Sequence, residues 1–414
     1  MANKVAPPRW VGVVVSAWTF LVLGADLKTA IHPNIHWLVT AVAVTCALPY
    51  LLRLRLPLRL VLPGLIPSCL LALAVLLAGI RSDTPLYAIA EAAKLAIILI
   101  VARGLFTSEP ALAHHAVRGF VWAIGVNLAL LLFGLLGAGT AAELGPSRWG
   151  TLLNYPGSLA RLGFLGLCYA GYMVLVWKQP LRHLALLAAC GMLIYFDGSR
   201  TALLVIAVLV PYLLVIRLTE GGPRRFARLS RFATIGVACA AALLGFAGWR
   251  WLQAQTSVPE GTGAVARIAQ FAVSVKLNGA AGLALADPVR VRMIETGMDA
   301  LRNASLIGHG VGTTQADTDF GLMVVHMTYL QIIGDLGVLG LMAYLWLVLG
   351  WVAWLPRAWR NIRRIESPSS RALYFNAIFL LAAFALSGLF HPLSTEWSEW
   401  IMFIVPSALF WEIV

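Results

Sequence analysis

Charged residues are scarce in this chain: they make up 12% of its 414 residues, against about 25% in a typical soluble domain. Long polar stretches are also rare, and the one substantial example lies near residues 250–325. These absences leave no room for a separate soluble domain. The chain instead has apolar length, because 60% of its residues are hydrophobic and apolar runs recur along nearly all of it. Composition therefore predicts a polytopic membrane protein.

Cysteine is sparse as well. The 5 cysteines lie inside apolar runs without polar partners at metal-ligand spacing, so we interpret them as small hydrophobic residues. No clear small-residue cleavage site follows the first apolar run, 10–23, and we expect this run to be a membrane span rather than a cleaved signal. The sequence shows no tandem repeat or low-complexity tract.

A hydrocarbon core needs about 20 apolar residues per helix, and the chain offers about twelve candidate transmembrane helices of roughly this length. They fall near 10–24, 36–52, 60–80, 86–105, 116–138, 158–177, 182–196, 201–217, 232–249, 337–355, 372–390 and 398–413. The expected fold class is thus an all-α polytopic membrane protein. Its expected organisation is nine spans in 1–249, one large outer loop in 250–336 and three spans in 337–414.

Lysine and arginine in short loops mark the cytoplasmic side of a membrane protein. With the N-terminus placed inside, most of the Lys and Arg residues fall in inner loops and tails. The net charge of +13 is therefore a topology signal and not a nucleic-acid footprint. Both termini are expected inside and the large loop outside. Its pieces 264–275 and 289–301 are expected to be short amphipathic helices on the membrane surface.

Charged residues on the outer face are the candidates for chemistry, since topology does not explain them and charges near a membrane are costly. Arg200 lies three residues after Asp197 in a very short outer turn, where the two could pair. It is either an interfacial arginine or a guanidinium that faces an anionic ligand. Arg290 and Arg292 point in different directions on a helix, so one of them is expected to face a site. The alternative for both is a solvated helix face.

Two histidines are further candidates. His326 opens an apolar helical stretch that includes Tyr329 and Gln331, and it is either an interfacial histidine with a satisfied hydrogen bond or a general base. His309 lies among the alternating glycines of 308–312, which allow tight turns and close ligand approach. It could also be only a turn residue.

Other polar residues carry weaker signals. Arg148 and Arg161 flank Asn154 near the outer end of the sixth expected span, as anion contacts or interface anchors. Asp317 and Asp319 form a lone DxD pattern, which is common by chance in a polar loop, so no metal site is predicted. Within a span, Glu91 and Lys94 are expected to pair with each other.

Three segments in order carry a family likeness: Asp197–Ala202, Ile307–Thr313 and His326–Leu341. Together they resemble the O-antigen ligase superfamily, which includes O-antigen ligases, O-antigen polymerases and bacterial O-linked oligosaccharyltransferases. The motif-bearing part runs from about Asn154 to Leu341. One departure is Met327, where family members often have Asn after the motif histidine.

The resemblance implies a C-type glycosyltransferase-like fold in the bacterial inner membrane, with a periplasmic active site. It implies an undecaprenyl-diphosphate-linked glycan as donor and, for a ligase, a sugar hydroxyl of the lipid A–core as acceptor, in a metal-independent inverting reaction without a cofactor. His326 would then be the base, and Arg200 with Arg290 the clamps on the diphosphate. The remaining candidates would contact the substrates: Arg292, Arg161, Arg148, Asn154, His309, Tyr329 and Gln331.

Within this superfamily, polymerase and protein glycosylation stay open. The chain ends soon after its last apolar run, and we expect the lack of a C-terminal extension to favour a ligase. The non-enzyme alternative is a transporter for lipid-linked sugar. Transporters hold their substrates near the membrane midplane, whereas the candidate charges here lie at the outer face, which favours surface chemistry. Expected partners are the donor, the acceptor and membrane lipids, and no nucleic acid.

Overall fold

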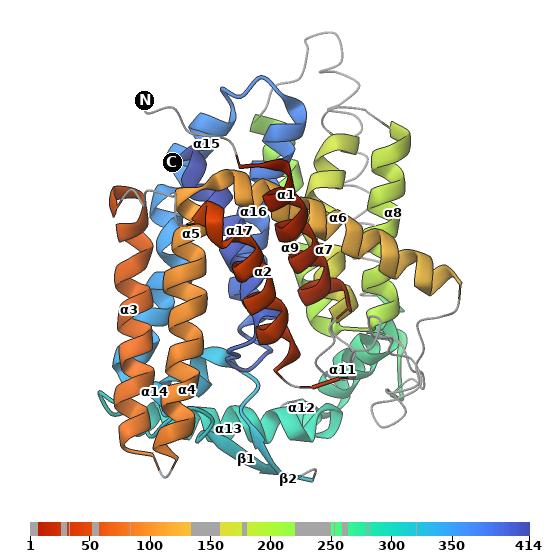
Figure 1. Ribbon diagram of the computed structural model, residues 1–414. Coiled ribbons are helices and arrows are strands. Elements are labelled where there is room, and N and C mark those ends of the chain that lie inside the picture. The colour runs from red at the N-terminus through yellow and green to blue at the C-terminus, as the bar shows by residue number, and fades with distance from the viewer. Residues whose placement is uncertain are drawn as a thin grey trace.

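Apolar runs fold into helices throughout the described chain (Figure 1). The computed structural model describes residues 7–25, 31–32, 34–51, 58–82, 84–133, 158–175, 180–219, 250–251, 253–258, 264–279, 281–319 and 321–414. All but one of the expected spans coincide with a helix, and the exception, 232–249, lies outside the described residues. Helices satisfy their backbone polar groups internally, which is what an apolar surrounding demands.

The helices of the first half lie up to residue 219. They are α1 (Arg9–Phe20), α2 (Ile35–Leu51), α3 (Leu58–Ile80), α4 (Pro85–Ala96), α5 (Arg103–Ser108), α6 (Pro110–Leu132), α7 (Ser158–Leu175), α8 (Pro180–Asp197) and α9 (Arg200–Thr219). Two π-helical turns, Leu21–Ala25 and Ile97–Ala102, extend α1 and join α4 to α5.

The second half contains helices and one small hairpin. Its elements are α11 (Ala264–Asn278), α12 (Ala281–Ala286), α13 (Pro288–Arg302), β1 (Gln315–Thr318), β2 (Gly321–Val324), α14 (Thr328–Leu349), α15 (Leu355–Ile362), α16 (Pro368–Ser387) and α17 (Trp397–Ile413). The two strands pair antiparallel, with Gln315 opposite Val324. This hairpin departs from the purely helical fold that the sequence predicts.

Within the part of the chain that the structure describes, four helical segments are long and apolar enough to cross a membrane: Pro85–Ser108, Pro110–Leu132, Thr328–Ile362 and Pro368–Ser387. Several shorter apolar helices accompany them, among them Ile35–Leu51. A bundle of this composition indicates a multi-pass membrane protein. The expected number of about twelve spans remains a prediction, as does the particular membrane.

Helix α17 lies in the middle of the bundle (Figure 1). Every side chain from Trp400 to Phe410 is buried. A helix that is apolar on all sides is stable where other helices surround it, and its neighbours include α16, α5 and α6. The first turn of α17, near Trp397, is therefore held in place at one end of the bundle.

Helix α14 begins at Thr328, earlier than the expected span 337–355, and is interrupted at Gly337. Gly337 has φ 75° and ψ −170°, a conformation open essentially to glycine alone. The amides of Val338 and Leu339 donate to the carbonyls of Ser305 and Leu306, at 3.0 and 3.2 Å. The break therefore docks the preceding loop onto α14. Gly337 divides α14 into two parts, and the uninterrupted apolar run from which the span was predicted corresponds to the second part.

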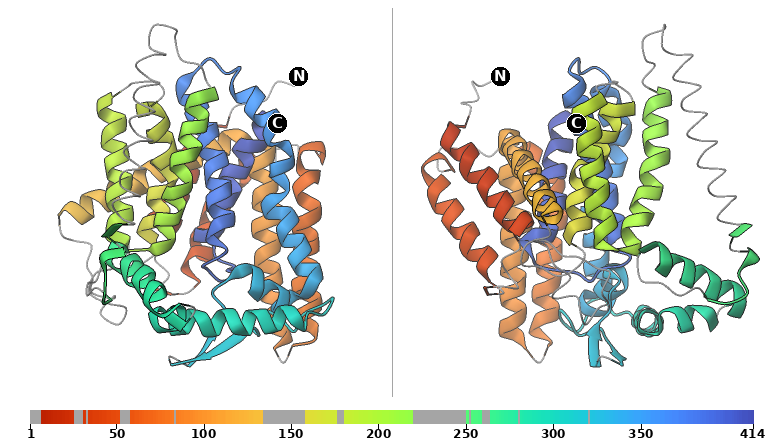
Figure 2. Two further views of the ribbon diagram at one scale, coloured as in Figure 1. Left: turned by 180° about the vertical axis from the view of Figure 1, so that it is seen from behind. Right: turned by 90° about the vertical axis from the view of Figure 1, so that its right-hand side faces the viewer.

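Helices α11, α12 and α13 lie across one end of the bundle, roughly perpendicular to α3 and α14 (Figures 1 and 2). The two amphipathic pieces expected in the large loop thus do form helices. Helix α13 begins with Pro288, and the Asp287 side chain accepts a hydrogen bond from the Arg290 amide at 3.3 Å, a typical N-cap. It buries Met293 and Gly297 and leaves Ile294 exposed.

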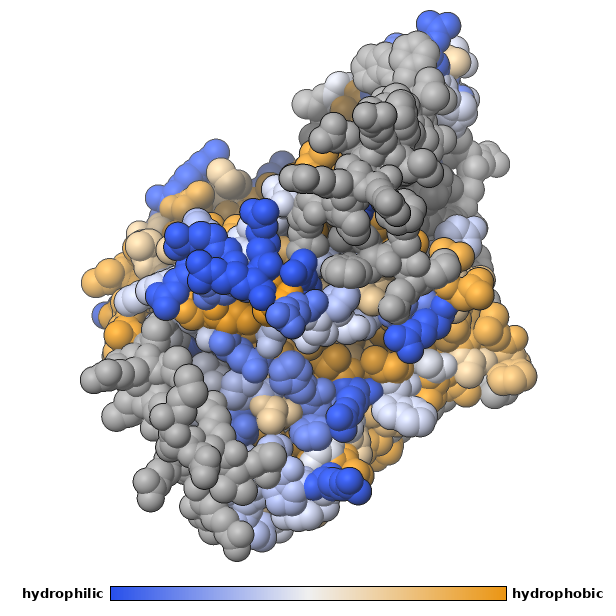
Figure 3. Space-filling model, turned by 90° about the horizontal axis from the view of Figure 1, so that it is seen from above, coloured by the Kyte–Doolittle hydropathy of each residue, from blue (hydrophilic) through white to orange (hydrophobic). Residues whose placement is uncertain are grey.

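The beginning of α1 and the end of α17 lie at the opposite end, with α15 (Figures 1 and 2). Seen from above, hydrophilic side chains gather at that end, over an apolar flank (Figure 3). Exposed arginines of α15 and the following turn belong to it: Arg357, Arg360, Arg363 and Arg364. The fold therefore separates a basic end from the end covered by α11–α13.

Replacing Gly337 with alanine tests the break in α14. An added Cβ would lie 2.6 Å from the Leu306 carbonyl oxygen and 2.7 Å from the Gly308 nitrogen, both backbone atoms. We expect Gly337→Ala to lower the apparent Tm in detergent, since the backbone conformation alone costs about 1–3 kcal/mol for a residue with a side chain.

Gly125→Ala on α6 is the matched control, because nothing lies within 4 Å of its added Cβ and alanine favours a helix. An equal Tm for the two variants would contradict the requirement for glycine at position 337.

Candidate functional site

Some candidate residues lie beyond what the structure describes. Arg148 and Asn154 are outside the described residues. Arg200 is the first residue of α9, but its side chain is not described. Its neighbours are placed: Ser199 and Thr201 line a cavity near the start of α7.

His326 and Arg290 line one cavity, although they are far apart in the sequence. The cavity has a volume of about 340 Å³ and lies between helices α11 and α13 on one side and the bundle on the other. Apart from Asp287 its other lining residues are apolar: Leu204, Phe271, Val291, Met293, Ile294, Met327, Leu389 and Phe390. A mainly apolar cavity with a few convergent polar groups is the usual form of a small-molecule site.

The imidazole of His326 has a defined orientation. Its Nδ1 lies 2.7 Å from the carbonyl oxygen of Val324. Since a carbonyl oxygen only accepts hydrogen bonds, Nδ1 carries the hydrogen in the neutral ring, and this assignment follows from the hydrogen bond. Nε2 is then left with its lone pair. His326, two residues before the start of α14, thus has a free ring nitrogen of the kind that a general base requires.

Arg290 and Arg292 diverge, as their spacing on a helix predicts. The Arg290 guanidinium lies 3.5 Å from the Asp287 carboxylate and 5.9 Å from the centre of the Phe390 ring, beside the cavity. Arg292 instead pairs with Asp319 of the β1–β2 turn at 3.0 Å, where both side chains are about half exposed or more. Of the two arginines, Arg290 is therefore the one that faces the cavity.

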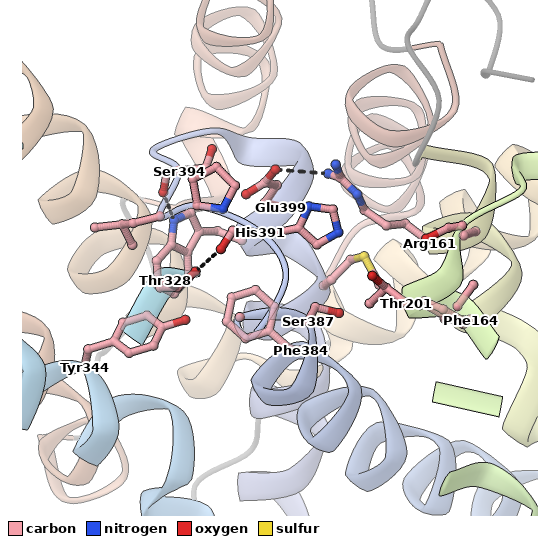
Figure 4. Close-up of a pocket in the computed structure, with 18 residues that line it drawn as sticks. Arg161, Phe164, Thr201, Thr328, Tyr344, Phe384, Ser387, His391, Ser394 and Glu399 are labelled. Carbon is pink, nitrogen blue, oxygen red and sulfur yellow. Dashed lines mark hydrogen bonds and ion pairs between the residues drawn. The ribbon is translucent and has the colours of Figure 1, made fainter. Parts of the chain in front are cut away.

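A second, more polar cavity of about 60 Å³ lies beside the first. The Arg161 guanidinium from α7 and the Glu399 carboxylate from α17 form an ion pair across 3.4 Å along one side (Figure 4). Tyr344 and Phe384 lie on the other side (Figure 4). The same three chain segments, 199–204, 326–328 and 387–391, contribute to both cavities. The two cavities therefore share a wall.

Sequence reasoning missed Glu399 and His391, which also line the second cavity. Both follow α16, in a region interpreted only as apolar spans. A signal was available: His391 and Pro392 interrupt two apolar runs, and Glu399 is a carboxylate at the start of an otherwise apolar helix. An ionisable group in such a position is a candidate for function.

The glycine-rich segment 307–313 binds an internal carboxylate. Asp335 of α14 is fully buried, and it accepts hydrogen bonds from the backbone amides of Gly312 and Thr314, both at 2.7 Å. It also accepts a hydrogen bond from the side-chain amide of Gln331, at 2.9 Å. The loop therefore uses these amides for Asp335 rather than for an external anion. His309 lies in this loop with an exposed side chain and lines neither of the two cavities.

The first turn of α14 is connected to helix α16 and to the segment between α16 and α17. The Gln331 side-chain oxygen accepts from the Leu393 amide at 2.6 Å, and the Tyr329 hydroxyl donates to the Ala385 carbonyl at 2.7 Å. The Thr328 hydroxyl donates to the His391 carbonyl at 2.6 Å (Figure 4). Tyr329 and Gln331 thus have their polar groups engaged inside the protein, where they hold the wall between the two cavities.

Asp197 fixes the turn that carries Arg200. Its carboxylate is buried and accepts a hydrogen bond from the Ala160 amide, in the first turn of α7, at 3.0 Å. A carboxylate in this position caps the helix and complements its dipole. This hydrogen bond attaches the turn before α9 to the helix that carries Arg161, and the expectation that Asp197 could pair with Arg200 stays a prediction because the Arg200 side chain lies outside the described residues.

Comparison with models of protein families and with curated proteins finds no match for this chain.

Asp335 provides a test of how the cavity wall is held. We expect Asp335→Asn to lower the apparent Tm strongly, because the amide turns an N–H toward backbone donors and leaves at least one of them unpaired. A buried unpaired donor costs about 1–3 kcal/mol.

The matched control is Asp299→Asn on α13, where the carboxylate pairs with Arg302 in solvent and contributes about 0–1 kcal/mol. Thermal unfolding of both variants in detergent gives the comparison. A loss no larger for Asp335→Asn than for Asp299→Asn would show that this carboxylate does not hold the loop.

Proposed function

We propose that this protein is a membrane glycosyltransferase that uses a lipid-diphosphate-linked glycan as donor. The single observation that carries the proposal is that His326 and Arg290 line one apolar cavity at the end of the bundle. A base and a guanidinium in apolar surroundings match a substrate with an ionised head and a hydrocarbon tail. The motif resemblance described above supports the same chemistry and favours an O-antigen ligase.

The reaction proposed for this site is a single displacement. The acceptor hydroxyl loses its proton to Nε2 of His326 as its oxygen forms a bond to the anomeric carbon of the donor. The bond from this carbon to the phosphate oxygen breaks, and its electron pair leaves with undecaprenyl diphosphate. Because the attack comes from the opposite face, the configuration inverts. No metal ion or cofactor takes part in this scheme.

Arginines take the role that a divalent cation has in many other phosphate reactions. Charge accumulates on the leaving diphosphate, and a fixed guanidinium stabilises it through charge-assisted hydrogen bonds. Arg290 is proposed for this role because it lies beside the cavity with His326. Arg200 is proposed for the same role from its place at the start of α9, between residues that line both cavities. Lys would be a poor replacement, since its ammonium lacks the bidentate fork.

The more specific assignment is transfer of O-antigen to a lipid A–core sugar at the periplasmic face of the bacterial inner membrane, with both termini cytoplasmic. O-antigen polymerase and O-linked protein oligosaccharyltransferase share the donor and differ in the acceptor. Donor chemistry is therefore tested first, and the acceptor is tested by supplying lipid A–core and protein acceptors in parallel.

His326→Ala tests the base. We expect the rate of glycan transfer by purified protein to fall by about 10²–10⁴-fold, the usual contribution of a general base, while donor binding is retained. The assay uses undecaprenyl-diphosphate-linked glycan and lipid A–core, with EDTA present because no divalent cation is required.

The control is His32→Ala, which removes an exposed imidazole from the turn before α2. Transfer by His326→Ala near the wild-type rate would refute the base, and a requirement for added Mg²⁺ would refute the metal-independent scheme.

Arg290→Gln and Arg292→Gln make a matched pair on one helix. We expect Arg290→Gln to reduce transfer by about 10²-fold or more, as does loss of one preorganised charge-stabilising donor. Arg292→Gln loses only an exposed ion pair with Asp319, so its transfer rate should stay within a few-fold of wild type. A larger loss in Arg292→Gln than in Arg290→Gln would assign the diphosphate contact to the wrong arginine.

A further inference from the structure

A groove of about 760 Å³ lies between α1 and α6, near the beginning of α1 and away from the two cavities (Figure 1). None of its lining residues contributes to either cavity. The groove combines two arginines, Arg9 and Arg118, with aromatic and aliphatic side chains. The proposed transfer reaction makes no use of it.

The two helices that line the groove, α1 and α6, pack closely against each other. A Cβ added to Gly12 would lie 2.4 Å from the His115 ring, and one added to Gly119 would lie 2.5 Å from the Ser16 carbonyl oxygen. The Ser16 hydroxyl also donates to the His115 carbonyl at 2.9 Å. The helices touch only because these residues are small. The groove beside this contact is lined by small residues of α1, such as Gly12 and Ala17, and by large side chains such as Trp122.

Polar and apolar residues are segregated along the groove. Contacts of Gly12 with His115 and of Gly24 with Ala123 show that α1 and α6 run in the same direction. Arg9 and Arg118 therefore come first along their helices, and Phe20 and Trp122 follow them. Trp122 is 67% exposed, as expected for a side chain that faces hydrocarbon rather than protein.

The guanidiniums of Arg9 and Arg118 have no carboxylate partner within ion-pair distance in the described part of the chain. The Nδ1 atom of His115, which also lines the groove, is buried without a hydrogen-bond partner among the same residues. Two cations beside apolar side chains match a ligand that is anionic at one end and apolar along the rest.

We propose that this groove binds an anionic phospholipid, with its phosphate between Arg9 and Arg118 and an acyl chain along Phe20 and Trp122. A guanidinium binds phosphate oxygens through paired hydrogen bonds, and basic pockets between membrane helices bind anionic lipid head groups. Charge complementarity favours an anionic over a zwitterionic lipid. The apolar wall favours a lipid over a soluble phosphate. Bound lipid bridges α1 and α6 and thereby stabilises the fold by mass action.

The test uses the full-length protein, purified and stripped of lipid, in detergent. Phosphatidylglycerol and phosphatidylcholine with identical acyl chains are titrated, with bound lipid counted by native mass spectrometry and the apparent Tm measured in parallel. We expect phosphatidylglycerol to bind more tightly and to raise the Tm. In Arg9→Gln/Arg118→Gln its affinity should fall roughly 30-fold, the combined effect of two arginines at a membrane surface.

The charge-matched control is Arg363→Gln/Arg364→Gln, which removes two exposed arginines at the same end of the bundle, outside the groove. It should bind phosphatidylglycerol like wild type. If the groove variant does not fold, Arg118→Gln alone serves, with an expected loss of about 5-fold. Equal affinity for the two lipids, an equal loss in the control variant, or equal stabilisation by soluble glycerol phosphate would each overturn the proposal.

Discussion

The buried carboxylate of Asp335 is the interaction on which the candidate site depends. In an apolar bundle a carboxylate is tolerated only with donors around it, and here the donors come from the glycine-rich loop and from Gln331. One side chain thereby fixes three pieces of chain: the loop, the start of α14 and, through Gln331, the segment before α17. His326 lies two residues before the helix that this network holds.

The same network explains why the motif-like residues are not all ligand contacts. The sequence stretch after His326 looks like a continuous functional signature, yet Tyr329, Gln331 and Asp335 direct their polar groups into the protein. They leave one side of the wall to the apolar cavity and the other to the polar one. His326 and Arg290 lie on the apolar side, so the wall matters to the proposed function because it holds the segment that carries the proposed base.

The proposed lipid groove between α1 and α6 and the candidate site are formed by different interactions. The site is held by hydrogen bonds to a buried carboxylate, whereas the two helices that line the groove approach closely because Gly12 and Gly119 lack side chains. Its cations lack carboxylate partners among the described residues, while Arg161, Arg290 and Arg292 each have one. This difference in pairing indicates that the arginines of the groove and those of the site have different roles.

The sequence by itself determined the features that depend on local pattern. Apolar runs specified helices, Asp287 and Pro288 specified the start of α13, and the spacing of Glu91 and Lys94 gave an ion pair at 2.6 Å. Only the tertiary structure decided which distant residues meet. It placed Arg290 and His326 along one cavity, paired Glu399 with Arg161, and gave the glycine loop an internal carboxylate at Asp335. These arrangements join segments whose separation along the chain carries no periodic signal, so only packing of the helices brings them together.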